Sequence, residues 1–189
     1  MTRDEILEAA ARIISQKGFE AASMQDIAES VNLQKASLYH HFTSKQEILL
    51  ALLDQALDLL TIRMEQVIAQ PLSPDVKLRQ AMVSYLETLA TNRELSAVLL
   101  LEHRSLQPEF RSRHIPRRDR YEYLWRNLIQ EGIDAGLFTC IDTALAGRAL
   151  LGVLSWTITW YHPDGQLSPD DIADRFADLF LQGLLVRGD

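Results

Sequence analysis

Hydrophobic residues recur along most of the chain at spacings of three and four, and no segment alternates with the two-residue period of a half-buried strand. The first such stretch begins with a capping box, in which Thr2 and Glu5 can satisfy each other's backbone N–H groups, and it ends at Lys17 and Gly18. One apolar stripe lies between these ends: Ile6, Leu7, Ala10, Ile13 and Ile14. The pattern predicts an all-α chain.

Two short helices and one long helix are predicted next. The second helix should begin after Ser23 and end before Asn32, a residue that tolerates the left-handed conformation at a helix end. A third helix must lie within 35–42, and the tight turn between the second and third fits a helix-turn-helix unit. Another capping box, from Ser44 to Glu47, predicts a fourth helix that runs towards Ala69.

A proline-containing break at 70–74 separates this part from a second helical region. We predict helices at 75–92, 94–106, 117–135 and 142–161, with a less regular piece at 107–116. Ser168 and Pro169 have the residue preferences of a helix start, and they predict a last helix at 169–187. The expected organisation is a three-helix helix-turn-helix domain at 1–47 and a larger helical domain at 48–189.

Composition and charge narrow the class of protein. The 189 residues are 47% hydrophobic and 24% charged, which is typical of a globular chain. The single cysteine, Cys140, excludes an internal disulfide, and no signal-peptide pattern appears, so we expect a cytoplasmic protein. The longest apolar run, at 144–161, is interrupted by Arg148 and by hydroxyl side chains, which indicates a buried helix and no membrane span. The net charge of −7 argues against nonspecific binding to nucleic acid.

One stretch departs from this acidic balance. Residues 33–45 read LQKASLYHHFTSK and hold two lysines and no acid, although five basic and seven acidic residues give 1–47 a net charge of −2. A helix turns about 100° per residue, so with Leu38 facing the core an exposed face forms around Ala36 and His40. This face suits a DNA major groove about 12 Å wide, where Ala36 can contact a thymine methyl group and His40 can donate to a guanine edge or a phosphate. Lys35 and Lys45 lie at the first turns of helices, where backbone N–H groups also attract phosphate.

This stretch has other interpretations. The adjacent His40 and His41 point about 100° apart on a helix and cannot share one ion, so we expect no metal site. The ordinary alternative is an amphipathic surface helix with Phe42 in the core. No Gly-rich phosphate loop, nucleophile elbow or Cys-x-x-Cys is present, so we expect no catalytic residue, no cofactor and no enzyme. A helical enzyme and a protein-interaction module that uses the 33–45 face stay open as alternatives.

The segment from Ser23 to Glu47, SMQDIAESVNLQKASLYHHFTSKQE, resembles the DNA-binding signature of TetR-family transcriptional regulators. The resemblance covers about residues 3–52, and the helical remainder agrees with the family in length and pattern. The family commonly has glycine where Asn32 stands, serine or threonine where Gln34 stands, and a glycine–threonine pair where Ala36 and Ser37 stand. These departures bear on the operator sequence more than on the fold.

The resemblance implies a repressor that binds a double-stranded DNA operator. Tyr39, His41 and Lys45 are then expected to contact phosphates, and Ser23 to cap the second helix. Base reading is expected from Lys35, Ala36, Ser37 and His40, next to Gln34 at the helix start. Phosphate contacts set position, whereas base contacts set sequence.

The resemblance also implies a small-molecule pocket in the larger domain. Its 109–169 part resembles regulators that sense acyl-CoA or related lipid metabolites, so the expected effector is small and hydrophobic, with an acyl-CoA-like compound as one candidate. The expected ligand-binding residues are Tyr85, Leu89, His103, Arg117, Arg118, Tyr121, Trp125 and Trp156. The six arginines of 103–120 are either a solvated, charged connector or a basic mouth that receives a carboxylate or phosphate.

The last two helices are expected to form a homodimer interface, as a four-helix bundle with their mates. The expected interface residues are Ala144, Gly147, Leu151, Leu154, Phe176, Phe180, Gly183 and Leu184. Two recognition helices about 34–36 Å apart would then meet successive major grooves of a palindromic operator. Ligand binding would tilt the helix from Ser44 to Ala69 and move the DNA-binding heads off this spacing.

Overall fold

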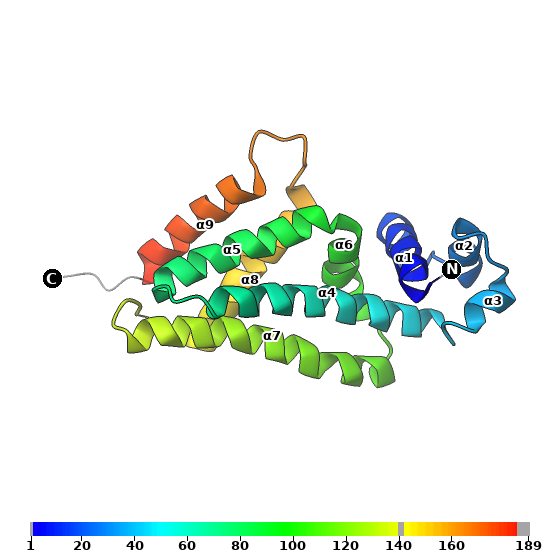
Figure 1. The fold of residues 1–189 in the computed structure, drawn as a ribbon, viewed down its shortest axis with the longest axis horizontal. Helices are drawn as coiled ribbons and strands as arrows, with labels where there is room; N and C mark the ends of the chain where they lie inside the picture. Colours follow the sequence, from blue (N-terminus) through cyan, green and yellow to red (C-terminus); the bar gives the residue numbers. More distant parts are fainter. Residues whose placement is uncertain (1, 140–141, 185–189) are drawn as a thin grey trace. The chain divides into compact units, whose positions relative to one another are not determined.

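The computed structural model describes residues 2–139 and 142–184, with side chains described as far as Gln182, so Cys140 lies outside the described residues. Apart from turns, loops and an isolated bridge position at Phe138, the described residues form helices, and the predicted all-α class is confirmed (Figure 1). The helices are α1 (Arg3–Lys17), α2 (Met24–Ser30), α3 (Lys35–Tyr39), α4 (Lys45–Ile68), α5 (Pro74–Thr91), α6 (Arg93–Glu102), the short 3-10 turn η1 (His103–Ser105), α7 (Pro108–Asp134), α8 (Thr143–Trp160) and α9 (Pro169–Leu184).

The chain forms two compact units whose sequences interleave. The first unit comprises Met1–Asp58 and Asn92–Arg118, and the second comprises Leu59–Thr91 and Asp119–Asp189. The divisions fall inside α4 and α7, so each of these long helices contributes to both units. The functional division at 47/48 stays a prediction.

The first unit is built on α1, which packs against α2 and α6. Its start is the predicted capping box: the Glu5 N–H donates to Thr2 Oγ1 at 3.2 Å, and the Thr2 N–H donates to Glu5 Oε2 at 2.6 Å. Its end is Gly18, which adopts a φ of 80° that other residues rarely adopt. The predicted apolar stripe is buried at Ile6, Leu7, Ala10 and Ile14, with Ile13 half-buried. Burial of each large side chain contributes about 1.5–3 kcal/mol, which fixes α1 in the unit.

The start of α4 differs slightly from the predicted capping box. The Glu47 N–H donates to Ser44 Oγ at 3.1 Å, as expected. The Glu47 carboxylate, however, accepts from the backbone N–H and the hydroxyl of Thr43, at 2.7 and 2.8 Å, instead of from Ser44. Thr43, the residue before Ser44, is therefore also hydrogen-bonded to the first turn of α4.

The less regular piece predicted at 107–116 is wrong, because α7 is helical from Pro108 onwards. Pro108 occupies the first helical position, where its missing N–H costs nothing. Pro116 lies inside the helix and removes one backbone hydrogen bond, but its fixed φ is compatible with helix, and the helix continues through it to Asp134. The predicted 94–106 helix is correspondingly shorter, since α6 ends at Glu102 and η1 follows.

The end of α7 requires glycine at Gly132. A Cβ atom there would lie 2.0 Å from Cδ2 of the buried Phe138 ring. The Gly132 carbonyl also accepts from the N–H groups of Leu137 and Phe138, at 2.9 and 3.0 Å, and Gly136 has a φ of 70°. The chain thus turns back on the last turn of α7 and packs Phe138 on it.

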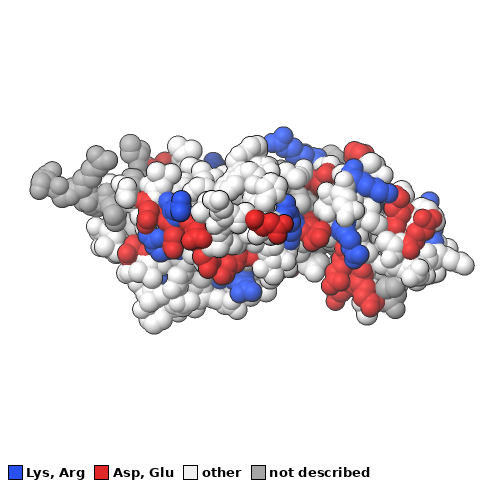
Figure 2. Space-filling view, turned by 90° about the horizontal axis from the view of Figure 1, so that it is seen from above, with Lys and Arg blue, Asp and Glu red and all other residues white. Residues whose placement is uncertain are grey.

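In the second unit, α5 packs along α9 and also contacts α8. Arg79 of α5 pairs with Asp174 at 3.0 Å and with Asp178, both on α9. Lys77 of α5, which is buried, donates to Glu131 of α7 at 2.9 Å. Lysine and arginine side chains are intermixed with acidic side chains on the face shown in Figure 2, and neither sign covers it. Within the described ranges, no helix is both long and apolar enough to cross a membrane.

Candidate functional site

The helix-turn-helix is formed by α2, a turn and α3, which pack on each other. Ser23 begins α2 as a full capping box with Asp26. Asn32 adopts the predicted left-handed conformation, with φ at 54°, and the Leu33 N–H donates back to the Ala28 carbonyl at 2.9 Å. Leu33 is half-buried, whereas Leu38 is fully buried, as predicted. This local geometry fixes which face of α3 is left for a partner.

The residues that the sequence singled out lie on α3 or directly beside its two ends. Tyr39 is 45% exposed. Gln34, Lys35, Ala36, His40 and His41 are exposed, and Ser37 is half-buried. Gln34 makes no side-chain cap hydrogen bond, in agreement with its expected weakness as a cap. The helix ends at Tyr39, so His40 and His41 lie just after it rather than within it.

Four carboxylates of residues 1–47 are engaged in helix caps or in local hydrogen bonds. Glu5, Asp26 and Glu47 cap the starts of α1, α2 and α4. Glu29 accepts a hydrogen bond from the Gln25 amide at 2.6 Å. Residues 1–47 have a net charge of −2, but α3 itself contains no acidic residue, and Lys35 is its charged side chain.

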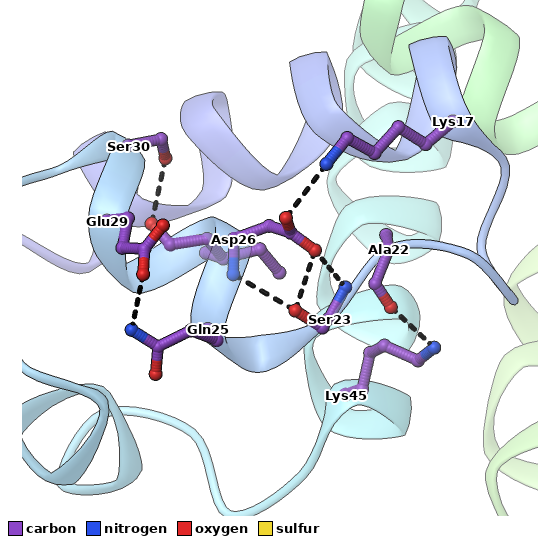
Figure 3. A network of polar contacts seen from close by, with 9 residues as sticks. Lys17, Ala22, Ser23, Gln25, Asp26, Glu29, Ser30 and Lys45 are labelled. Carbon is purple, nitrogen blue, oxygen red and sulfur yellow. Dashed lines mark hydrogen bonds and ion pairs between the residues drawn. The ribbon is translucent and has the colours of Figure 1, made fainter.

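Ser23 and Lys45 are both bonded inside the first unit (Figure 3). Ser23 Oγ accepts from the Asp26 N–H at 3.1 Å and lies 2.6 Å from Asp26 Oδ2. The Lys45 ammonium donates to the carbonyls of Phe19, Glu20 and Ala22, at 2.7, 3.2 and 2.7 Å. The contacts of both residues with DNA stay predictions.

The Asp26 carboxyl makes the start of α2 sensitive to acid. Hydrogen bonds from Lys17 and from the hydroxyl and N–H of Ser23 lower the pKa of Asp26 from 3.8 to about 2. A lowered pKa in the folded state means that ionised Asp26 stabilises the fold above about pH 4, and that this contribution is lost as the pH falls towards 2.

We expect Asp26→Asn to lower the melting temperature at about pH 5, and the difference from wild type to shrink as the pH falls to about 2. Thermal unfolding followed by circular dichroism at several pH values measures this difference. A difference that stays constant over that range would show that Asp26 does not act through its charge.

In the second unit, three predicted ligand-binding residues form one aromatic cluster. The ring centroids of Tyr85, Tyr121 and Trp125 lie 6.3–6.5 Å apart in each pair, and all three side chains are buried. Tyr85 Oη is 2.8 Å from Ser155 Oγ of α8. Leu89, one turn after Tyr85, is also buried.

Burial changes the pKa values of the two tyrosines in this aromatic cluster. It raises the pKa of Tyr85 to about 12, although the Ser155 hydrogen bond opposes the rise, and it raises the pKa of Tyr121 well above its usual value. The Trp125 indole N–H is fully buried and has no hydrogen-bond partner among the described residues. The indole N–H of Trp125 lowers the pKa of Tyr121 and so opposes the effect of burial. The two groups do not, however, meet the geometry of a hydrogen bond. A buried donor without a partner costs about 1–3 kcal/mol, so this group is suited to a ligand.

The arginine region of 103–120 lies mainly in the first unit, and several of its side chains have partners there. Arg117 pairs with Asp54 and Asp58 of α4, and the buried His114 lies 3.0 Å from Asp54. Arg111 donates to the carbonyls of Arg104 and Leu106. In the second unit, Arg120 pairs with Glu65 at 2.7 Å. Because Arg117 is already paired with two aspartates, these contacts favour a structural role for it over binding the carboxylate or phosphate of a ligand.

The other predicted ligand-binding residues have mixed surroundings. His103 is half-buried in the first unit, and burial lowers its pKa. Arg118 is exposed in the same unit. Trp156 is 66% exposed on α8, so it does not join the buried aromatic cluster.

The predicted dimer residues divide between two sides of α8 and α9. Leu154 is fully buried, and Gly147 faces α7 with Trp125 Cβ 4.0 Å from where its own Cβ would lie. These two positions are packed in the core of the protomer, and their contribution to an interface stays a prediction. Ala144, Leu151, Phe176 and Phe180 are half-buried, and Gly183 and Leu184 have side chains outside the described residues.

Sequence reasoning named Gly152 and Val153 as support for an interface on these helices, but it did not assign the more exposed apolar side chains around them to it. Leu145, Trp156 and Leu179 are 63%, 66% and 67% exposed, and Val153 and Trp160 are also exposed. A Cβ at Gly152 would meet nothing within 4 Å. On α8 these residues recur at spacings of three, four and seven, and this periodicity was the signal in the sequence that could have pointed to the face. Trp156 was instead predicted to bind the ligand. Gln46, which bonds the Ser105 carbonyl and the Gln107 N–H, carried no signal.

Comparison with known proteins places both parts of the chain. Residues 6–52 match the model of bacterial regulatory proteins of the tetR family, and residues 71–184 match the tetracyclin repressor-like C-terminal domain. The HTH-type transcriptional repressor KstR2 of Mycobacterium tuberculosis is 27% identical over 188 residues, which are 98% of this chain and 94% of that protein.

Two solved structures are similar over nearly the whole chain. The TetR-family regulator PfmR of Thermus thermophilus has 39% sequence identity and a TM-score of 0.86, with 94% of this chain and 97% of that chain covered. AibR in complex with isovaleryl coenzyme A and operator DNA has 30% identity and a TM-score of 0.85, with 94% and 96% covered. The chain therefore belongs to the TetR family of transcriptional regulators.

Proposed function

We propose that this regulator binds a palindromic operator as a two-fold homodimer and that a small hydrophobic effector with an acyl group releases it. The observation that carries the proposal is the exposed, acid-free face of α3, on which Lys35, Ala36 and Tyr39 are open to a partner. Base reading is assigned to Lys35, Ala36, Ser37 and His40, and phosphate contact to Tyr39 and His41. Since such a regulator acts on the chromosome, we place it in the cytoplasm.

The proposed dimer uses the exposed side of α8 and α9. Leu145, Gly152, Val153 and Trp156 on α8, together with Leu179 on α9, leave an apolar surface of a kind that usually marks an interface. Gly152 allows a second copy of α8 to approach closely. A two-fold pair would place the recognition helices at the half-site spacing of about 34–36 Å.

The proposed effector site is the buried aromatic cluster of Tyr85, Tyr121 and Trp125. AibR, with 30% identity over this chain, is solved with isovaleryl coenzyme A and operator DNA. An acyl group fits an apolar, aromatic interior, and its thioester carbonyl would accept a hydrogen bond from the unpartnered Trp125 N–H. Effector and DNA would each weaken binding of the other by the same factor.

Binding to duplexes recovered by in vitro selection tests the DNA function. Titration with acyl-CoA compounds of increasing chain length tests the effector, with free coenzyme A as control.

We expect Trp125→Phe to keep an aromatic ring at this position and to leave the DNA affinity unchanged. It should raise the acyl-CoA concentration that releases half of the bound DNA about five- to tenfold, since the proposed buried hydrogen bond to the effector is lost. An unchanged half-release concentration would exclude Trp125 as the donor.

A further inference from the structure

Lys45, in the first turn of α4, uses its whole hydrogen-bonding capacity inside the first unit. An ammonium group has three N–H donors. Those of Lys45 lie 2.7, 3.2 and 2.7 Å from the carbonyls of Phe19, Glu20 and Ala22. The same ammonium lies 4.4 Å from the centroid of the Phe19 ring, within the range of a cation–π contact. Lys45 therefore binds the chain that links α1 to α2.

This linking segment is held from its other side by Lys17. In Figure 3, Lys17 reaches Asp26 from α1, while Lys45 reaches Ala22 from α4. Lys17 Nζ lies 2.8 Å from Asp26 Oδ1, and Asp26 in turn closes the capping box with Ser23. The start of α2 is thus fixed between two lysines, and α3 packs on α2.

We propose that Lys45 is a positioning residue: it fixes the α1–α2 segment against the start of α4, and so sets the orientation of α2 and α3, instead of contacting a DNA phosphate. The proposal rests on the DNA interface proposed above. A phosphate contact would require the ammonium to release carbonyls that it already binds. Lys35 offers the contrast, because its side chain is exposed on α3 and its ammonium makes no hydrogen bond or ion pair with any residue that the structure describes.

The salt dependence of DNA affinity separates the two roles. A lysine that contacts phosphate releases counterions, so its loss reduces the slope of log K against log salt by about 0.9, or about 1.8 for two subunits of a dimer. A positioning lysine lowers the affinity at every salt concentration and leaves the slope unchanged. The two kinds of lysine also differ in their effect on stability.

The experiment compares Lys45→Met, Lys45→Arg and Lys35→Met in the full-length protein. The probe is a duplex recovered by selection with the wild-type protein, and fluorescence anisotropy measures its affinity between about 50 and 200 mM salt. Lys45→Met should weaken binding about tenfold or more with an unchanged slope, because charge-assisted hydrogen bonds to the α1–α2 segment are lost. Lys35 carries its charge on the exposed face of α3 that the proposed interface places against the polyanionic DNA, so Lys35→Met should still lower the slope, and it should leave the melting temperature unchanged.

Lys45→Arg is the decisive variant. Arginine binds phosphate at least as well as lysine, but its planar guanidinium cannot converge on three carbonyls as an ammonium does. We therefore expect Lys45→Arg to resemble Lys45→Met in affinity and in lowered melting temperature. Wild-type behaviour of Lys45→Arg, or a slope lowered by Lys45→Met as much as by Lys35→Met, would overturn the proposal.

Failure of the DNA function would look different. In that case the wild-type protein would bind no duplex in a salt-dependent way. Amide hydrogen exchange of residues 18–26 would still test the role of Lys45. Faster exchange in Lys45→Met than in Lys35→Met would support the positioning role, and equal exchange would contradict it.

Discussion

Gly152→Glu is expected to convert the protein to a monomer at micromolar concentration and to weaken operator binding by roughly 100-fold or more. The isolated protomer has room for the new side chain, since a Cβ at Gly152 meets no atom within 4 Å, and the helix gains from losing a glycine. In the proposed dimer the carboxylate would instead lie in an apolar contact against a second α8, where an unpaired charge is costly. Analytical ultracentrifugation gives the oligomeric state, and anisotropy gives the affinity.

The control for this variant is Asn127→Glu, which adds the same carboxylate to an exposed position on α7. It should leave both the sedimentation and the DNA affinity unchanged. If Gly152→Glu remained dimeric and bound its operator normally, the exposed side of α8 could not be the interface.

Ala36→Glu is expected to abolish operator binding, with a loss of roughly 100-fold or more, because it places a carboxylate on the face that enters the groove of the negatively charged DNA. The fold should not suffer. Ala36 is exposed in the first turn of α3, where an acidic side chain is favoured by the helix dipole. Circular dichroism and sedimentation should therefore match wild type while anisotropy shows no binding.

Ala69→Glu makes the same substitution at an exposed position just after α4, and it should bind the operator as wild type does. A loss of affinity shared by both variants would indicate that added negative charge acts at long range. Normal binding by Ala36→Glu would remove α3 from the interface and favour a protein-interaction role for its exposed face.

Much of the fold could be predicted because its helix ends are encoded locally. Thr2 with Glu5, and Ser23 with Asp26, satisfy backbone donors within three residues, so each start is visible in the sequence. The left-handed Asn32 is likewise a local signal. Pro116 misled the prediction of α7, because proline disfavours a helix interior on average but removes only one hydrogen bond when the helix is held by its other contacts.

The faces of α8 could not be assigned from the sequence. Apolar residues occur all round this helix, so its periodicity does not distinguish the side of Leu154, which is buried, from the side of Trp156, which is exposed. The bonds of Lys45 were also beyond reach, because its partners at 19–22 are brought near by tertiary packing and not by spacing along α4. The predicted exposure of α3 succeeded because Leu38 fixed its orientation.

The two hydrogen bonds of Gln46 have a consequence for chimeric regulators, in which the DNA-binding head of one protein is joined to the body of another. Gln46 donates to the Ser105 carbonyl at 2.9 Å and accepts from the Gln107 N–H at 3.0 Å. A graft of residues 1–47 would carry Lys45 together with its partners at 19–22, but it would separate Gln46 from 105–107. The first unit is discontinuous in sequence, so a graft that preserves its contacts must take both 1–58 and 92–118.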